Sequence, residues 1–298
     1  MRVSGRRAFL AAAAYPLAAR AQCRLEPSAF VRLRAIEGFP VVDAAVNGTP
    51  VTFLLDTGAQ AHLVVPDAAA ELRLQLLPGT MPLIGTGGAR AAPIVALAGV
   101  SLGVVQLDPA PTPVAPLPPS VPHMTPMLAG LLGASLLDRF DLLLDVQAGQ
   151  LGLYDAAGCG GALPSLAPRM TAIGLAITPD RQALLPVQIN GQVVTALLDT
   201  GSRATLLTAD AARRLGLSAP ESANDARGVD GERLPVGHTR VRELAVGDDL
   251  RRNVPISISP LQLGQADMLL GFDYLRQRRV WISYVTARLV IALPGPAP

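Results

Sequence analysis

Residues 47–63 read NGTPVTFLLDTGAQAHL, and residues 190–206 read NGQVVTALLDTGSRATL. The two stretches lie 143 residues apart and are identical at 11 of 17 positions. The similarity continues downstream, where an LLG triplet at 131–133 returns at 269–271 with an offset of 138. Internal similarity over this length indicates a tandem duplication. We therefore expect two lobes built on one plan.

Each half has the sequence pattern of a β unit with single short helices. Its first two strands are joined by an Asn-Gly pair, which is typical of a tight hairpin. The predicted strands are 41–46, 51–55 and 62–65 in the first half, and 184–189, 194–198 and 205–208 in the second. A short helix is expected next, at 66–74 and at 209–215. The eight prolines between 109 and 126 predict a stiff, extended surface insertion in place of a packed element.

The composition excludes several classes of function. Of the 298 residues 50% are apolar and 16% charged, as in a folded globular chain. All 25 basic residues are Arg, and the lack of Lys excludes Schiff-base enzymes, P-loop NTPases and protein kinases. With a net charge of +2, few aromatic residues and no basic run, nucleic-acid binding is not expected. Neither CxxC nor HExxH occurs, so the sequence does not support a zinc site.

The chemistry lies in the two Asp-Thr-Gly triplets, which begin at Asp56 and Asp199. By composition alone about 0.08 copies are expected in a chain of this length. Two copies in the same repeat register, each after Leu-Leu, are therefore a strong signal. The alternative is a pair of Asp-initiated turns that cap strands. It does not explain why both carboxylates follow apolar strands, where a charge is poorly solvated and costly.

A pseudo-twofold arrangement of the two halves would place these aspartates opposite each other. Two carboxylates that close share one proton, so one acts as a base and the other as an acid at the same pH. Such a pair can activate a water and protonate a leaving group without a covalent intermediate. The glycine after each Thr allows a sharp turn and close approach of the backbone.

At these residues the chain resembles aspartic proteases, and in particular the retropepsin-like bacterial family, over about 30–293. The resemblance implies an all-β, two-lobed acid-protease fold of the retropepsin and pepsin type, with duplicated lobes and a few short helices. It makes Asp56 and Asp199 the catalytic pair. The supporting residues of the catalytic loops are then Thr57, Gly58, Thr200, Gly201 and Ser202, the two Thr forming cross-lobe hydroxyl contacts. The Leu-Leu-Gly segments resemble the family element that supports the catalytic loop from behind. The Gly-rich hairpins resemble substrate-binding flaps, at Gly85, Gly87 and Gly88 and at Gly228, Asp230 and Gly231.

The implied function is that of an aspartic endopeptidase acting on peptides or proteins, with no metal and no cofactor. Because both triplets lie on one chain, we expect a functional monomer. The alternative is a catalytically silent protein that binds extended peptides in the cleft between the lobes. The chain divides into a signal peptide at 1–21, an N-terminal lobe at 22–154, a connector at 155–169 and a C-terminal lobe at 170–293.

The N-terminus predicts export. Residues 1–21 read MRVSGRRAFLAAAAYPLAARA, a basic start and an apolar run of about a dozen residues that ends in an A-x-A-like cleavage site. A membrane span needs roughly 20 apolar residues, so we expect a cleaved signal and a periplasmic or secreted protein. The Arg6-Arg7 pair resembles a twin-arginine signal. The sequence leaves open whether Cys23 and Cys159 form a disulfide after export.

The two catalytic loops differ at one position. Ser202 follows the second triplet, where Ala59 follows the first. A hydrogen bond from the Ser202 hydroxyl to Asp199 would favour the ionised form of that carboxyl. We therefore expect Asp56 to hold the shared proton.

Overall fold

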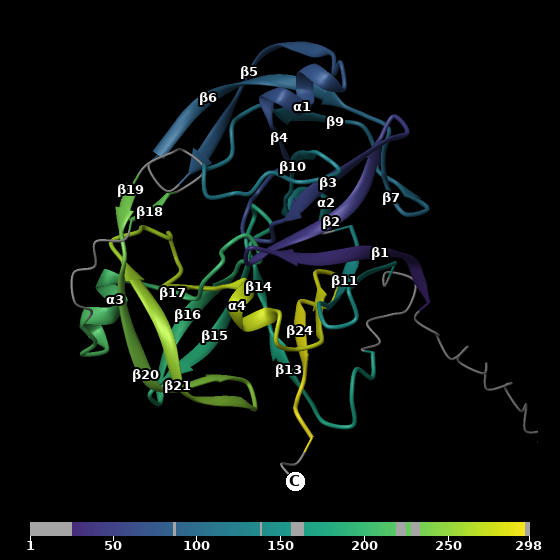
Figure 1. The fold of residues 1–298 in the computed structure, drawn as a ribbon. Helices are drawn as coiled ribbons and strands as arrows, with labels where there is room; N and C mark the ends of the chain where they lie inside the picture. The colour runs from purple at the N-terminus through teal and green to yellow at the C-terminus, as the bar shows by residue number, and fades with distance from the viewer. Residues whose placement is uncertain are drawn as a thin grey trace, which may run out of the picture.

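The computed structural model describes residues 26–85, 88–137, 139–155, 164–218, 225–227 and 233–295. Strands make up most of the described chain, and the helices are single and short (Figure 1). The predicted signal peptide and both cysteines lie outside these residues. Within them, no helix combines the length and the apolar character that a membrane crossing requires.

The first half contains twelve strands and two helices among its described residues. They are β1 (Pro27–Ile36), β2 (Phe39–Val46), β3 (Thr49–Leu55), β4 (Leu63–Val64), α1 (Pro66–Glu71), β5 (Leu76–Gly85), β6 (Gly88–Leu97), β7 (Val100–Leu102), β8 (Val105–Gln106), β9 (Ala110–Pro113), β10 (Leu128–Leu132), α2 (Ala134–Leu137), β11 (Asp141–Asp145) and β12 (Gln150–Tyr154).

The second half also contains twelve strands and two helices among its described residues, in a similar order. Its elements are β13 (Met170–Gly174), β14 (Ala176–Ile177), β15 (Ala183–Ile189), β16 (Gln192–Leu198), β17 (Leu206–Thr208), α3 (Ala209–Arg214), β18 (Asp225–Arg227), β19 (Arg233–Pro235), β20 (Gly237–Val246), β21 (Asp249–Ser259), β22 (Met268–Leu270), α4 (Phe272–Leu275), β23 (Val280–Ser283) and β24 (Arg288–Ala292). The prediction of an all-β fold with two duplicated lobes is confirmed.

The hairpin that leads to each triplet forms where the Asn-Gly pairs predict it. Asn47 and Gly48 have φ of 50° and 80°, and Asn190 and Gly191 have φ of 52° and 85°. Positive φ at both central residues is the requirement of a two-residue hairpin turn that matches strand twist. These turns set the pairing of β2 with β3 and of β15 with β16, which delivers each triplet to the end of a central strand.

A crossing strand supports each triplet. β10 runs parallel to β3 and antiparallel to β4, so it lies between the strands that flank the first triplet. β22 does the same between β16 and β17. The strand order in the second lobe is β14-β15-β16-β22-β17-β21-β20, and a further pairing of β15 with β20 closes this sheet on itself.

One sheet joins the two halves. Its strands run in the order β13-β24-β23-β11-β12-β1 before the sheet continues into the first lobe. The junction is the antiparallel pair β11–β23, where Leu143 lies opposite Trp281. Trp281 is fully buried, and its ring lies 4.6 Å from that of Tyr154. The aromatic pair therefore packs the second half against the first at this junction of the shared sheet.

The interpretation of the proline-rich segment as an unpacked insertion is wrong at its start. β9 pairs with β6, with Pro113 opposite Ile94 and Pro111 opposite Ala96. Thr112 is buried and Ala115 belongs to an apolar cluster. Proline is compatible with this position because β9 is an edge strand of its three-stranded sheet, where a missing N–H breaks no inner ladder.

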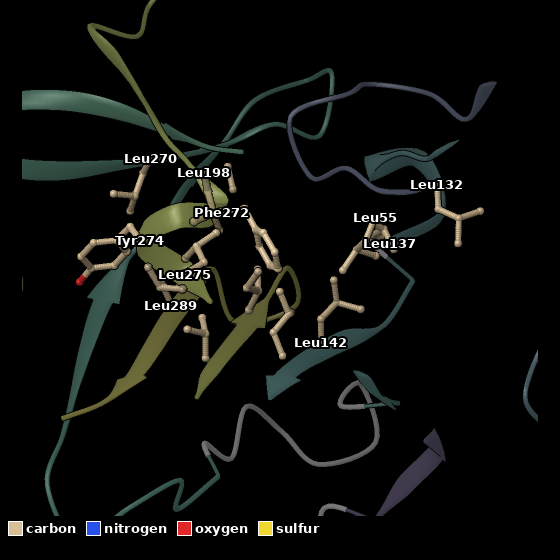
Figure 2. Close-up of a cluster of buried hydrophobic side chains, with 14 of the residues drawn as sticks. Leu55, Leu132, Leu137, Leu142, Leu198, Leu270, Phe272, Tyr274, Leu275 and Leu289 are labelled. Carbon is tan, nitrogen blue, oxygen red and sulfur yellow. The ribbon is translucent and has the colours of Figure 1, made fainter. Parts of the chain in front are cut away.

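The main core extends behind both triplets and across the lobe boundary. Figure 2 shows its central part, where side chains of the two halves meet. Many of them occupy equivalent positions in the repeats, such as Leu55 and Leu198, Leu132 and Leu270, and Leu137 and Leu275. The aliphatic composition thus provides one continuous support beneath both loops.

Candidate active site

Each aspartate follows a central strand and is held by the backbone of its own loop. The N–H groups of Gly58 and Ala59 both donate to Oδ1 of Asp56, at 3.0 Å each. The N–H of Ser202 donates to Oδ1 of Asp199 at 3.0 Å. Each loop therefore turns back on its carboxylate and fixes its orientation.

The two threonines join the loops across the lobes. The backbone N–H of Thr57 donates to Oγ1 of Thr200 at 3.0 Å, and the N–H of Thr200 donates to Oγ1 of Thr57 at 3.1 Å. Each hydroxyl then donates to a carbonyl of the opposite lobe, Thr57 to Leu198 at 2.8 Å and Thr200 to Leu55 at 2.6 Å. Both side chains are fully buried, so this reciprocal network is shielded from water.

The glycines of the triplets bring the opposing carboxyl groups together. A Cβ atom on Gly58 would lie 2.5 Å from Cγ of Asp199, and one on Gly201 would lie 2.3 Å from Cγ of Asp56. Each carboxyl group therefore packs on the backbone of the other lobe. The two carboxyl groups therefore lie close together at the boundary between the lobes.

Burial dominates the electrostatics of this pair. It raises the pKa of both carboxyls, because the charged form loses its hydration. The pKa of Asp199 is raised further by the negative charge of Asp56, and the backbone N–H groups oppose the shift at both residues. This environment favours one proton shared between the two groups.

The expected role of the Ser202 hydroxyl is wrong. Its Oγ donates to the carbonyl oxygen of Ala204 at 2.8 Å, and a hydroxyl has only one hydrogen to donate. The group that bonds Asp199 is the Ser202 backbone N–H, and the Ala59 N–H does the same for Asp56. The difference between Ser and Ala therefore does not move the proton to Asp56.

The Leu-Leu-Gly segments lie behind the loops. The carbonyl of Leu132 accepts the N–H of Asp56 at 3.0 Å, and the carbonyl of Leu270 accepts that of Asp199 at 3.1 Å. The glycines that follow, Gly133 and Gly271, lack room for a side chain, since a Cβ atom on either would come within 2.6 Å of backbone. Strands β10 and β22 thus fix the backbone positions of both aspartates.

A second pair of contacts ties each loop to the helix behind it. In the first lobe Nε2 of His62 lies 3.4 Å from Oγ of Ser135. In the second lobe the hydroxyl of Thr205 donates to Asp273 at 2.8 Å. His62 is buried, which lowers its pKa to about 4. His62 and Thr205 occupy the same position of the repeat, and the repeat offset alone does not reveal that both contact the helix behind the loop.

Two further contacts across the lobes were not expected from the sequence. Nε2 of Gln182 donates to the carbonyl of Gly58 at 2.9 Å. The repeat counterpart of Gln182 is Phe39, whose ring lies 5.3 Å from Cζ of Arg203. Each lobe therefore uses the same repeat position to contact the catalytic loop of the other. The offset of 143 relates these positions, but it does not show that they face the opposite lobe.

The predicted flaps lie only partly within the described residues. β5 and β6 form the first predicted hairpin, with Gly85 opposite Gly88, and Gly87 lies outside the described residues. In the second lobe β18 and β19 pair, with Arg227 opposite Arg233. The predicted flap residues between those strands, Gly228, Asp230 and Gly231, lie outside the described residues.

Among the described residues, no group of three or more His, Cys, Asp and Glu side chains could hold a metal ion. The site therefore contains two partly buried carboxyl groups with raised pKa values, on two loops that the threonine bonds hold together. Two such groups can act as a general acid and a general base on a bound water.

Comparison with known proteins gives a family match over both lobes. Residues 42–136 and 185–274 match the family described as "Aspartyl protease". The two matched segments contain both triplets and both Leu-Leu-Gly elements.

Similar curated proteins match one part of the chain. The UBA domain-containing protein Mud1 of Schizosaccharomyces pombe is 33% identical over 100 residues, which are 33% of this chain and 29% of Mud1. DNA damage-inducible protein 1 of Neurospora crassa is 29% identical over 110 residues, which are 36% of this chain and 24% of that protein. The chain thus spans less than a third of the length of these relatives. Among solved structures, a retropepsin-like aspartic protease from Rickettsia conorii is 17% identical and covers 43% of this chain and 95% of its own, with a TM-score of 0.31.

Proposed function

We propose that this chain, which belongs to the aspartyl protease family, is an endopeptidase that hydrolyses peptide bonds with a water held between Asp56 and Asp199. The observation that carries the proposal is the packing of each carboxyl group on the glycine of the other lobe. That packing brings two partly buried carboxyls close together, an arrangement in which they share one proton. A binding protein has no evident use for two such costly groups.

We propose a cycle that starts with Asp56 charged and the shared proton on Asp199. Asp56 takes a proton from the water, whose oxygen attacks the peptide carbonyl carbon, while Asp199 gives its proton to the carbonyl oxygen. Asp56 then gives its proton to the amide nitrogen, and Asp199 takes one from a hydroxyl of the tetrahedral intermediate as the C–N bond breaks. The products are a carboxylic acid and an amine, and the pair again holds one proton on Asp199.

The surrounding structure supports this cycle. The reciprocal threonine bonds keep the loops at a fixed separation, so the pair does not need to reorganise during the reaction. The backbone N–H bonds to each Oδ1 stabilise whichever carboxyl is charged. We also propose that the two hairpins, β5–β6 and β18–β19, cover an extended peptide in the cleft.

Both triplets lie on one chain, and every cross-lobe contact described above is intramolecular. We therefore propose a functional monomer, whose activity per molecule does not change on dilution. A specific activity that collapses at nanomolar concentration would contradict this. We also propose that residues 1–21 direct export, which is tested by cell fractionation and by the N-terminal mass of the exported protein.

The function is tested by incubating the full chain with a peptide library and identifying new termini by mass spectrometry. We expect cleavage that a pepstatin-type inhibitor blocks and that chelators leave unchanged. Asp56→Asn and Asp199→Asn should each remove nearly all activity while the protein stays folded. Peptide binding without cleavage by the unaltered chain would instead identify a silent peptide-binding protein.

A further inference from the structure

A charged side chain stands beside the catalytic loop of the second lobe. Arg203 lies four residues after Asp199 and is exposed to solvent. Its guanidinium Cζ lies 5.3 Å from the ring centre of Phe39, and its Nε approaches Gly38, where a Cβ atom would come within 3.4 Å. Gly38 and Phe39 belong to the first lobe. Arg203 thus reaches across the lobe boundary next to the aspartate pair.

This contact orients the guanidinium and leaves its N–H groups available to an anionic ligand. Phe39 is 7% exposed, so its ring is a fixed platform for the cation. Within the part of the chain that the structure describes, Arg203 takes part in neither an ion pair nor a hydrogen bond. Arg251 and Arg278, by contrast, both pair with the buried Asp249.

The first lobe has no counterpart of this charge. The repeat partner of Arg203 is Gln60, which is exposed and neutral. The partner of Phe39 is Gln182, whose amide nitrogen is bound to the Gly58 carbonyl. The two sides of the aspartate pair therefore differ chemically, although their backbones are equivalent. The nearest acidic neighbour in sequence to the platform, Glu37, is exposed on the same turn as Gly38.

We propose that Arg203 binds a substrate carboxylate on one side of the scissile bond and makes the cleft selective for peptides with Asp or Glu at that position. The proposal rests on the function proposed above and names its substrate class. A planar guanidinium supported on one face by a ring presents its N–H groups at its edge, which is the geometry that a carboxylate accepts in a bidentate way. An extended peptide advances about 3.3 Å per residue, so a side chain a few positions from the scissile bond passes a loop residue four positions from Asp199.

The test compares matched peptides that differ only in Glu against Gln at successive positions around one scissile bond. With the unaltered chain we expect kcat/KM to be about three- to tenfold higher for Glu at one position, the range of a partly exposed charge pair. This preference should weaken as salt rises. In Arg203→Gln, which copies Gln60, the Glu/Gln ratio should fall to about one, and in Arg203→Glu it should invert.

Two further variants sharpen the result. Gln60→Arg should create a Glu preference on the other side of the scissile bond. Arg213→Gln removes an equal charge from α3, where Arg213 is exposed and pairs with Asp210, and should leave the Glu/Gln ratio of the unaltered chain. A ratio that stays the same in Arg203→Gln would overturn the proposal, as would an equal loss for both peptides, which would make Arg203 a clamp between the lobes.

A binding measurement separates this inference from the proposed function. The Glu and Gln peptides are titrated onto Asp199→Asn, with and without Arg203→Gln. If the unaltered chain cleaves nothing while the affinity for Glu peptides still depends on Arg203, the protease assignment fails and the carboxylate site stands. If the chain cleaves peptides and neither the affinity nor the rate depends on Arg203, only the carboxylate site fails.

Discussion

Thr57 and Thr200 each accept the backbone N–H of the other, at 3.1 and 3.0 Å, and neither side chain is exposed. Because each hydroxyl also donates to a strand carbonyl of the opposite lobe, the pair binds four main-chain groups, two in each lobe. The separation of the two aspartates is therefore set by hydroxyl groups that never meet the substrate.

Replacing one of these hydroxyls by a methyl group should loosen the site. In Thr200→Val the shape is kept, but the N–H of Thr57 and the carbonyl of Leu55 lose their partner. Unsatisfied buried groups of this kind cost about 1–3 kcal/mol each, so we expect about 2–6 kcal/mol less stability and a lower kcat. Urea unfolding and steady-state kinetics measure both. Thr200→Ser keeps the hydroxyl and is the control; equal behaviour of Ser and Val would contradict the role.

The glycine contacts predict a loss of activity from a single methyl group. Gly201→Ala places a Cβ atom 2.3 Å from Cγ of Asp56, so that carboxyl must move. A displacement of this size costs roughly a hundredfold in kcat for a group that must stay aligned with its partner. Gly174→Ala is the matched control, because its Cβ would meet only the guanidinium of Arg288 at 3.7 Å. Activity retained in Gly201→Ala would show that the pair is not close-packed.

The aspartate pair should cost stability at neutral pH. Folding raises the pKa of both carboxyls, so the unfolded chain loses these protons first as pH rises. The contribution of the pair is therefore most favourable below the unfolded pKa and is lost as pH rises through the folded values. We expect Asp199→Asn to be more stable than the unaltered chain near pH 7, and the difference to shrink toward pH 3. Thermal melts across this range check the sign; a neutral-pH destabilisation would contradict it.

His62 has the opposite dependence on pH. Burial lowers its folded pKa to about 4, from an ordinary value of 6.5. The unfolded chain then binds a proton that the folded chain does not, so stability should fall as pH drops from about 6.5 to 4 and stay level below that. The full effect is on the order of 3 kcal/mol. His62→Thr copies the residue of the second lobe and should flatten this part of the curve, whereas Ser135→Ala should keep it.

Much of this architecture could be read from the sequence. A register of 143 residues, two Asn-Gly turns and two triplets after Leu-Leu are local signals, and each fixes a strand, a turn or a loop. The pairing of the lobes followed from the duplication, because equivalent loops of a pseudo-twofold dimer meet at its axis. The strand at 110–113 was missed because proline lacks the N–H that pairing within a sheet requires. The sequence does not show that this strand lies at a sheet edge, where proline is tolerated.

The contacts that depend on three-dimensional direction could not be predicted. Ser202 could be placed beside Asp199, but the sequence does not show that its hydroxyl turns to Ala204. Gln182 and Arg203 carry ordinary polar side chains in the sequence, and only the folded chain shows that they cross the lobe boundary. Neither residue belongs to a sequence motif or a periodic pattern that would identify it as a cross-lobe contact.

The shared sheet has a consequence for biosynthesis. During translation the first lobe is complete before β23 has been made, and until then one side of β11 is an open edge. Between its terminal aspartates this strand contains three consecutive leucines, and such an edge can pair with another nascent chain. The charges of Asp141 and Asp145, at the two ends of the strand, oppose such pairing between nascent chains. β23 thus pairs with the open edge of a strand synthesised about 140 residues earlier, so a truncated chain would leave this leucine-rich strand unpaired on one side.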